Sequence, residues 1–150
     1  MWKTRWFTVA ALLSGCTSAN PAARFAGSWG YEPGSTATVV CGGGSSSVPF
    51  DTVVETFVES GGLLVKHDSQ GCTGLEFAVS GAVASLSSAG QSCTIPASGS
   101  NPQATFAPSS YSFTISADDA TLTESLTASY TPSGSSSSCT VTAANMLTRE

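Results

Sequence analysis

Five cysteines are the side chains of this sequence with the clearest chemistry. Cys16 lies near the amino terminus, and Cys41, Cys72, Cys93 and Cys139 follow at wide intervals, the last three spacings being 31, 21 and 46 residues. In an oxidising compartment four cysteines form two disulfides. An odd total leaves one thiol for a separate role.

Other side chains give no catalytic, metal or phosphate pattern. Zinc is disfavoured because no Cys-x-x-Cys pair occurs and His67 is the only histidine. His67 and Asp68 are neighbours in a predicted strand and so point to opposite faces. Asp68 therefore cannot orient His67 as a general base. Serine is abundant, but the Gly-x-Ser-x-Gly elbow of hydrolases is missing. Asp118-Asp119 reads as a solvent-facing turn, and glycines 42–44 lack the Lys-Ser/Thr of a phosphate loop. We therefore predict a protein that is not an enzyme and has no cofactor and no metal.

The amino terminus has the pattern of an export signal. Lys3 and Arg5 make it basic, and Trp6 to Leu13 is an apolar run of eight residues, too short to cross a bilayer. The segment Leu13-Ser14-Gly15-Cys16 resembles the lipobox of bacterial lipoproteins. The resemblance implies that the Cys16 thiol receives a diacylglycerol and that residues 1–15 are removed. Cys16 is then the odd cysteine.

A lipid-modified Cys16 predicts a protein anchored to the bacterial cell envelope. Each buried methylene contributes about 0.8 kcal/mol, so two or three acyl chains hold a protein on a membrane without a spanning helix. Residues 16–24 would form a short tether. Thr17 follows the cysteine, where an aspartate commonly retains lipoproteins at the inner membrane, so the outer membrane is favoured.

The charge of the processed chain excludes some partners. Arg24, Lys66 and Arg149 remain against ten acidic residues, a formal charge of 3 − 10 = −7. A surface of this sign repels nucleic-acid phosphates and anionic lipid head groups. We expect no nucleic-acid partner, and the sequence specifies no protein partner.

Residues 25–150 are predicted to be a single all-β domain. Serine and threonine number 45 and only 10% of the residues are charged, which suits strands and turns better than helices. Phe113 and Ile115 alternate with hydroxyl-bearing neighbours, the pattern of a sheet with one buried face. About eight antiparallel strands in a meander are expected to close as an up-and-down barrel or to flatten into a sandwich. The expected strands are residues 35–41, 51–58, 63–67, 72–79, 82–86, 111–116, 121–130 and 139–148, with a Gly/Ser turn at 42–47 and polar loops at 87–102 and 132–138.

The segment from Arg24 to Glu32, RFAGSWGYE, resembles the start of a lipocalin-type (calycin) barrel. In that family the tryptophan of a Gly-x-Trp motif closes one end of the barrel, under an arginine or lysine of the last strand. The resemblance implies that Trp29 and Arg149 form this barrel-closing pair. A guanidinium over an indole contributes about 0.5–2 kcal/mol, depending on burial.

This pair also predicts the disulfides. In a meander barrel with an even number of strands the first and last strands are antiparallel, so opposite residues have a constant sum of numbers. The sum is 178 for Trp29 with Arg149 and 180 for Cys41 with Cys139, and a bulge near Pro33-Gly34 would absorb the difference. We predict a Cys41–Cys139 bridge that closes the barrel by joining these strands and a Cys72–Cys93 bridge that clamps the hairpin around Ser80-Gly81.

Glu124 is the one candidate for a polar group in a ligand cavity. By alternation it shares a face with Leu122, Leu126 and Ala128, the apolar side of its strand. A buried carboxylate is costly unless it is paired or hydrated. The alternative, favoured by the cost of burial, is a bulge that shifts the register and exposes Glu124 to water.

Two functions follow from these expectations. The first is a lipid-anchored envelope protein that acts as a structural or interaction scaffold. The alternative is lipocalin-like binding of a small apolar ligand or lipid inside the barrel, because eight strands enclose a space that either side chains or one small ligand can fill.

Overall fold

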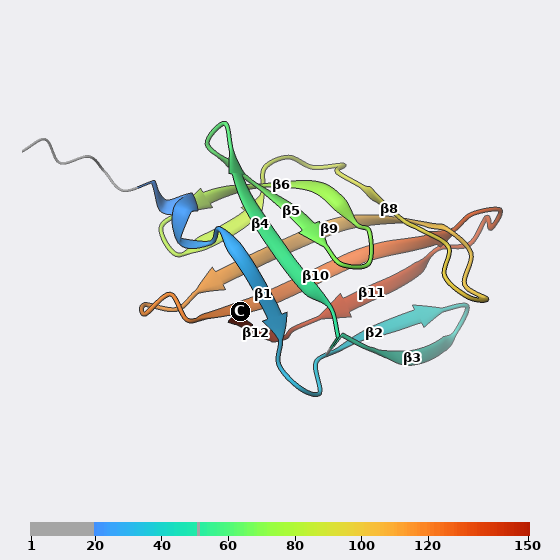
Figure 1. Ribbon diagram of the computed structural model, residues 1–150. Coiled ribbons are helices and arrows are strands. Elements are labelled where there is room, and N and C mark those ends of the chain that lie inside the picture. Colours follow the sequence, from blue (N-terminus) through green and yellow to red (C-terminus); the bar gives the residue numbers. More distant parts are fainter. Residues whose placement is uncertain (1–19, 51) are drawn as a thin grey trace, which may run out of the picture.

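The computed structural model describes residues 20–50 and 52–150 and is built almost entirely of β-strands (Figure 1). Asn20 caps a short 3₁₀ helix by accepting a hydrogen bond from the Ala22 amide on its side-chain oxygen. No helix in the described part of the chain is long and apolar enough to span a bilayer. The elements are η1 (Pro21–Arg24), β1 (Gly27–Tyr31), β2 (Thr36–Cys41), β3 (Gly44–Pro49), β4 (Val54–Ser60), β5 (Leu63–Asp68), β6 (Thr73–Ser80), β7 (Val83–Leu86), β8 (Cys93–Ile95), β9 (Ala104–Ile115), β10 (Thr121–Pro132), β11 (Cys139–Ala143) and β12 (Met146–Arg149).

Eight of these strands close a barrel in the order β1-β4-β5-β6-β7-β9-β10-β12, with β12 pairing back onto β1. Every pairing is antiparallel and the order follows the chain, so the predicted up-and-down barrel is confirmed. Two-residue turns make the tight hairpins. Gly61 and Gly62 join β4 to β5 with φ angles of 59° and 83°, the left-handed backbone that a type I′ turn requires.

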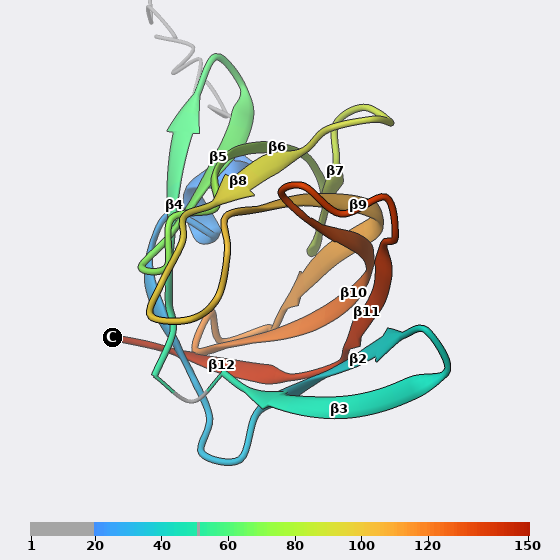
Figure 2. The same ribbon diagram turned by 90° about the vertical axis from the view of Figure 1, so that its right-hand side faces the viewer.

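The barrel continues at one end into an open sheet. Strands β9 and β10 are 12 residues each, much longer than the other strands of the barrel, and their far halves carry β8 on one side and β11, β2 and β3 on the other. Seen end-on in Figure 2, the β2–β3 hairpin and the segment around β8 flank the mouth of the barrel. We call this the open end.

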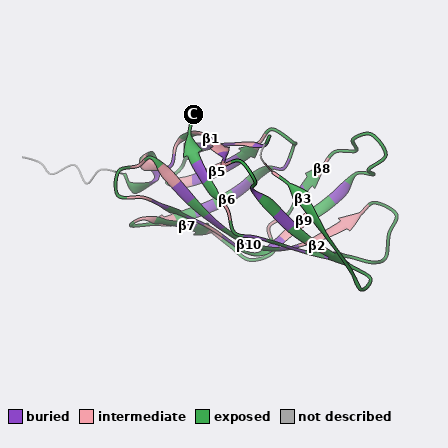
Figure 3. Cartoon of the chain, turned by 90° about the horizontal axis from the view of Figure 1, so that it is seen from below, coloured by how far each residue is buried: buried purple, intermediate pink, exposed green. Residues whose placement is uncertain are grey.

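The opposite, closed end is sealed by apolar and aromatic packing. Phe57, Phe77 and Phe113 meet edge to face, with ring centres 4.9–6.2 Å apart, and Trp29 is fully buried beside η1. Buried and exposed positions alternate along the strands of the barrel (Figure 3). Each strand therefore contributes one side to this core.

Arg149 covers Trp29 at this end. Its guanidinium carbon is 4.2 Å from the ring centre, and its nitrogens donate to the carbonyls of Arg24 and Ala26. Gly27 has a φ of +122°, and a Cβ there would lie 3.1 Å from the Arg149 guanidinium. The Gly-x-Trp pattern thus serves a local need: glycine leaves the space that the arginine occupies.

Both predicted disulfides are present, and the register explains the first. Trp29 pairs with Arg149, a sum of 178, whereas β2 and β11 pair with a sum of 180, as in Val39 with Val141. The two additional residues lie in the 32–35 turn, between β1 and β2. Cys41 and Cys139 are bonded, with Cα atoms 4.4 Å apart. The bridge ties the open sheet rather than the barrel wall, because β2 and β11 lie outside the barrel.

The sequence misplaced several boundaries. The expected turn at 42–47 is only Gly42-Gly43, and β3 follows at once; the loop expected at 87–102 contains β8. Strand β9 begins at Ala104, not at 111, and β4 begins at Val54, not at 51. The segment 139–148 forms two strands, β11 and β12. Both pair with β10 in the same register, so they lie one after the other along it. Strand β3 is exposed along its whole length and contains three serines, so hydrogen bonding to β2 and not burial defines it, and β8 is only three residues long.

Candidate functional site

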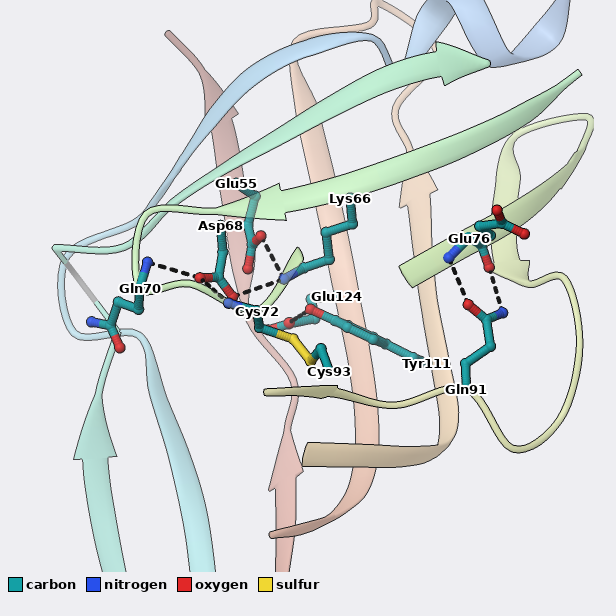
Figure 4. The surroundings of a disulfide bond; sticks show 10 residues. All are labelled: Glu55, Lys66, Asp68, Gln70, Cys72, Glu76, Gln91, Cys93, Tyr111 and Glu124. Carbon is teal, nitrogen blue, oxygen red and sulfur yellow. Dashed lines mark hydrogen bonds and ion pairs between the residues drawn. A yellow bond between two sulfur atoms is a disulfide. The ribbon is translucent and has the colours of Figure 1, made fainter. Parts of the chain in front are cut away.

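A cluster of polar side chains lies inside the barrel, between the closed end and the mouth (Figure 4). It contains three carboxyl groups, one ammonium group and two phenols. We call it the inner polar cluster. Its members are Tyr31 of β1, Glu55 of β4, Lys66 and Asp68 of β5, Tyr111 of β9 and Glu124 of β10.

Strand alternation turns these groups inward. Glu55 shares a face with Phe57, and Lys66 shares a face with Leu64; all four are buried. The apolar neighbours are fixed in the core, so the charged groups beside them must face the interior as well. Burying an isolated charge costs several kcal/mol or more, and mutual pairing is the way to offset that cost.

Lys66 is the centre of the charged part of the cluster. Its Nζ lies 2.7 Å from Glu55 Oε2 and 3.2 Å from Asp68 Oδ2, and it also faces the Tyr111 ring at 5.7 Å. Burial opposes the charge on Lys66, but the two carboxylates outweigh burial and raise its pKa. Lys66 therefore stays protonated and is not a nucleophile.

Glu124 is buried, with 1% of its surface exposed. Its Oε1 accepts hydrogen bonds from the hydroxyls of Tyr31 at 2.7 Å and Tyr111 at 2.9 Å, and its Oε2 accepts one from Asn145 Nδ2 at 3.0 Å. The register shift that would have exposed Glu124 is not there, because the irregularity in β10 lies beyond it, at Thr127/Ala128. These three hydrogen-bond donors compensate for the loss of hydration of the Glu124 carboxylate, which had made its burial unfavourable on sequence grounds.

Glu55 is the least satisfied acid of the cluster. Its Oε2 has the ion contact with Lys66 but no hydrogen bond of ordinary geometry. Its Oε1 lies 3.2 Å from the Tyr31 hydroxyl, whose single proton makes the shorter bond to Glu124. Burial, only partly offset by Lys66, raises the pKa of Glu55 from 4.5 to about 7. A protonated Glu55 can donate to the Tyr31 oxygen and complete the chain of hydrogen bonds.

The two phenols remain neutral. Burial raises the pKa of Tyr31 and of Tyr111 well above 10, and the nearby carboxyl groups raise it further. Both hydroxyls therefore act as donors. They hold Glu124 in place and separate it from Glu55.

A cavity of about 70 Å³ opens directly above this cluster and is lined by Glu55, Lys66, Asp68 and Tyr111. At the open end it meets a groove of about 760 Å³ between the β2–β3 hairpin and the segment after β8. Phe50, Gln70, Ile95 and Phe106 line both spaces. The mouth of the barrel is therefore a wide groove of mixed apolar and polar lining that narrows to a small space with charged side chains at its floor.

The second disulfide fixes one wall of this site. Cys72 lines the small cavity and is bonded to Cys93 of β8, which holds the β5–β6 loop against the open sheet (Figure 4). Asp68 Oδ1 accepts from the amides of Gln70 and Cys72 within that loop. The Gln91 side chain bonds to the backbone amide and carbonyl of Glu76, as a neighbouring strand would.

The other predicted site residues have clear positions where the structure describes them. Cys16, the predicted lipidation site, lies outside the described residues, as do residues 1–15. Trp29 and Arg149 form a pair at the closed end, remote from the cavity. His67 is exposed and Asp68 faces Lys66. Within residues 20–50 and 52–150 no three His, Cys, Asp or Glu side chains are arranged to hold a metal ion.

Sequence reasoning found Glu124 but missed Glu55 and Lys66. The same signal was available for all three, since each alternates with buried apolar residues on its own strand. The signal was applied to Glu124 alone, where the cost of burial favoured exposure to water, and Glu55 and Lys66 were not considered. Two opposite charges on apolar faces of adjacent strands would have indicated a buried pair.

Comparisons with known proteins add no family to this description. No protein-family model, no curated protein and no solved structure matches the chain.

Proposed function

We propose that this protein is an exported, lipid-anchored barrel that binds a small, largely apolar ligand at its open end. The observation that carries the proposal is the groove of about 760 Å³, which narrows to a polar floor inside a closed barrel. Ligand sites are typically apolar concavities of roughly 300–1,000 Å³ with a few convergent polar groups. A scaffold filled by its own side chains needs neither feature.

The walls of the groove support an apolar ligand. Val39 and Val48 of the hairpin face Ile95 and Phe106 across it, and Tyr130 lines it from β10. These side chains keep part of their surface exposed, whereas their equivalents at the closed end are buried. Covering them with a ligand would remove apolar surface from water, worth about 25 cal/mol per Å².

Export and anchoring rest on the sequence and are supported by the disulfides. Two bridges among four cysteines fit an oxidising compartment. The lipobox at residues 13–16 provides the anchor and accounts for the fifth cysteine.

Titration with the uncharged fluorescent probe N-phenyl-1-naphthylamine tests ligand binding. The protein beginning at Ser18 keeps every described residue and is suitable for the assay. We expect saturable binding with a blue-shifted emission, and its loss in Val39→Trp, which fills the groove. Thr127→Trp places the same side chain at an exposed position outside the groove and should bind as the unmodified protein does. Absence of saturable binding would favour the scaffold function instead.

A further inference from the structure

The least satisfied group of the inner polar cluster lies at the floor of the ligand site. Glu55 is 3% exposed, its Oε2 has the ion contact with Lys66 Nζ at 2.7 Å but no hydrogen bond of ordinary geometry, and its side chain lines the cavity of about 70 Å³. Glu124, by contrast, accepts three hydrogen bonds, and Asp68 accepts two from backbone amides besides its contact with Lys66. A buried carboxylate oxygen whose hydrogen bonds are incomplete is costly, so a further donor supplied by the ligand would be favourable here.

The charges around the cavity select the sign of the ligand. Glu55, Asp68 and Glu124 place three carboxyl groups against the single ammonium of Lys66. That ammonium is already in contact with two of the acids, so it has little attraction left for an anion. A cationic head group would offset part of this excess of negative charge inside the barrel.

The size of the cavity limits the head group. Its volume is about 70 Å³, several times the space that one water molecule requires. An ammonium with its first carbon fits such a space. The wider apolar groove outside then receives the rest of the ligand.

We propose that the site takes primary ammonium amphiphiles, with the cationic head against Glu55 and Asp68 and the apolar body in the groove. The inference rests on the proposed ligand-binding function and adds the chemical class of the ligand. Lys66 acts as a positioning residue that holds the two carboxylates apart and on the same side of the cavity.

Binding of this class is coupled to release of a proton. The groups that face Glu55 are Tyr31 of β1, Lys66 and Asp68 of β5, Tyr111 of β9 and Glu124 of β10. With the phenols neutral and Lys66 charged, Glu55 is the member whose raised pKa of about 7 lies in the physiological range. An alkylammonium beside Glu55 stabilises its ionised form, so the proton held in the free protein leaves when the ligand binds.

The test compares octylammonium, octan-1-ol and octanoate as competitors of N-phenyl-1-naphthylamine at pH 8 and pH 5.5. At pH 8 we expect octylammonium to bind at least tenfold more tightly than the alcohol, and octanoate more weakly than either. Below pH 7 the affinity for octylammonium should fall by up to about tenfold per pH unit, whereas the alcohol should show no such change. Calorimetry in two buffers of different ionisation enthalpy should register proton release for octylammonium alone.

The matched variants are Glu55→Gln and Glu59→Gln. Both lie on β4, but Glu59 is exposed and bonds to Asn20 at the closed end. Glu55→Gln should remove the preference for the ammonium and its pH dependence while keeping the affinity for octan-1-ol; Glu59→Gln should change neither. If Glu55→Gln does not fold, the pH profile and proton release of the unmodified protein still decide the matter.

The outcomes separate the two proposals. Binding of none of the three octyl compounds nor of the uncharged probe would overturn the ligand-binding function itself. Equal affinity for alcohol and ammonium, or tighter binding of octanoate, would leave that function standing and overturn the preference for a cationic head.

Discussion

The guanidinium carbon of Arg149 lies 4.2 Å from the centre of the Trp29 ring, in the register position directly opposite Trp29 across β1 and β12. This pair closes the end of the barrel at which the first and last strands meet. Arg149 also donates to the backbone carbonyls of Arg24 and Ala26. It therefore joins β12 to β1 and to the segment that precedes β1.

Arg149→Met should lower the free energy of unfolding by about 1–2 kcal/mol, because it removes the cation–π contact and these hydrogen bonds but keeps an apolar side chain over the indole. Urea denaturation followed by tryptophan fluorescence measures the change. Arg24→Met is the comparison, since the Arg24–Asp119 pair is half-exposed and should contribute less than about 1 kcal/mol. A larger loss of unfolding free energy in Arg24→Met than in Arg149→Met would contradict the stabilising role assigned to Arg149.

Replacing Glu124 tests whether the phenols depend on it. Glu124→Leu leaves the hydroxyls of Tyr31 and Tyr111 and the Asn145 amide without their acceptor, so we expect a loss of about 3 kcal/mol or more. Glu76→Leu, at an exposed position of β6, should change stability by about 0.5 kcal/mol or less. Chemical denaturation of the two variants under one set of conditions gives the comparison. Similar small losses of stability in both variants would mean that the hydrogen bonds to Glu124 do not stabilise the fold.

Stability should depend on pH through Glu55. Because its pKa rises from 4.5 to about 7 on folding, the folded protein retains a proton that the unfolded chain loses between those values. The resulting stabilisation is complete below pH 4.5 and is lost as the pH rises to 7, a change on the order of 3 kcal/mol. Denaturation midpoints at pH 5 and pH 7.5 should show a larger decrease in the unmodified protein than in Glu55→Gln. Parallel pH profiles for the two proteins would rule this account out.

The two disulfides should differ in what their removal does. Cys41–Cys139 closes 98 residues and Cys72–Cys93 closes 21, so the loop-entropy estimates are about 4.7 and 3.3 kcal/mol. Paired serine substitutions measure both losses in urea. Loss of either bridge should also weaken probe binding, because Cys72–Cys93 supports the wall of the small cavity and Cys41–Cys139 ties β2 to β11, which line the groove. Unchanged probe binding in both variants would show that the groove does not depend on the bridges.

The barrel could be predicted from the strand pattern together with the resemblance of RFAGSWGYE to the start of a calycin barrel, which implied that Trp29 pairs with Arg149. Trp29 with Arg149 and Cys41 with Cys139 have sums that differ by two, and the structure has an irregular turn of the required size between β1 and β2. Strand alternation then placed the apolar side chains correctly. These features depend on local pattern and on chain order, both of which a single sequence contains.

The inner polar cluster could not be predicted in the same way. Alternation assigns Glu55, Lys66 and Glu124 to inner faces, but only barrel closure brings β4, β5 and β10 around one point. Without those partners, burial of Glu124 appeared too costly. Strand β3 was missed for the opposite reason: all its residues are exposed, so no hydrophobic pattern marks it.

The 3₁₀ helix at the start of the described chain lies at the closed end, opposite the groove (Figure 1). Only four residue steps separate Cys16 from Asn20, which is at most about 14 Å of extended chain. With a lipid on Cys16, the barrel would stand on the bilayer by its sealed base, and its mouth would point into the aqueous space. A ligand would therefore enter the groove from the aqueous space or from another protein, and not directly from the membrane to which the barrel is anchored.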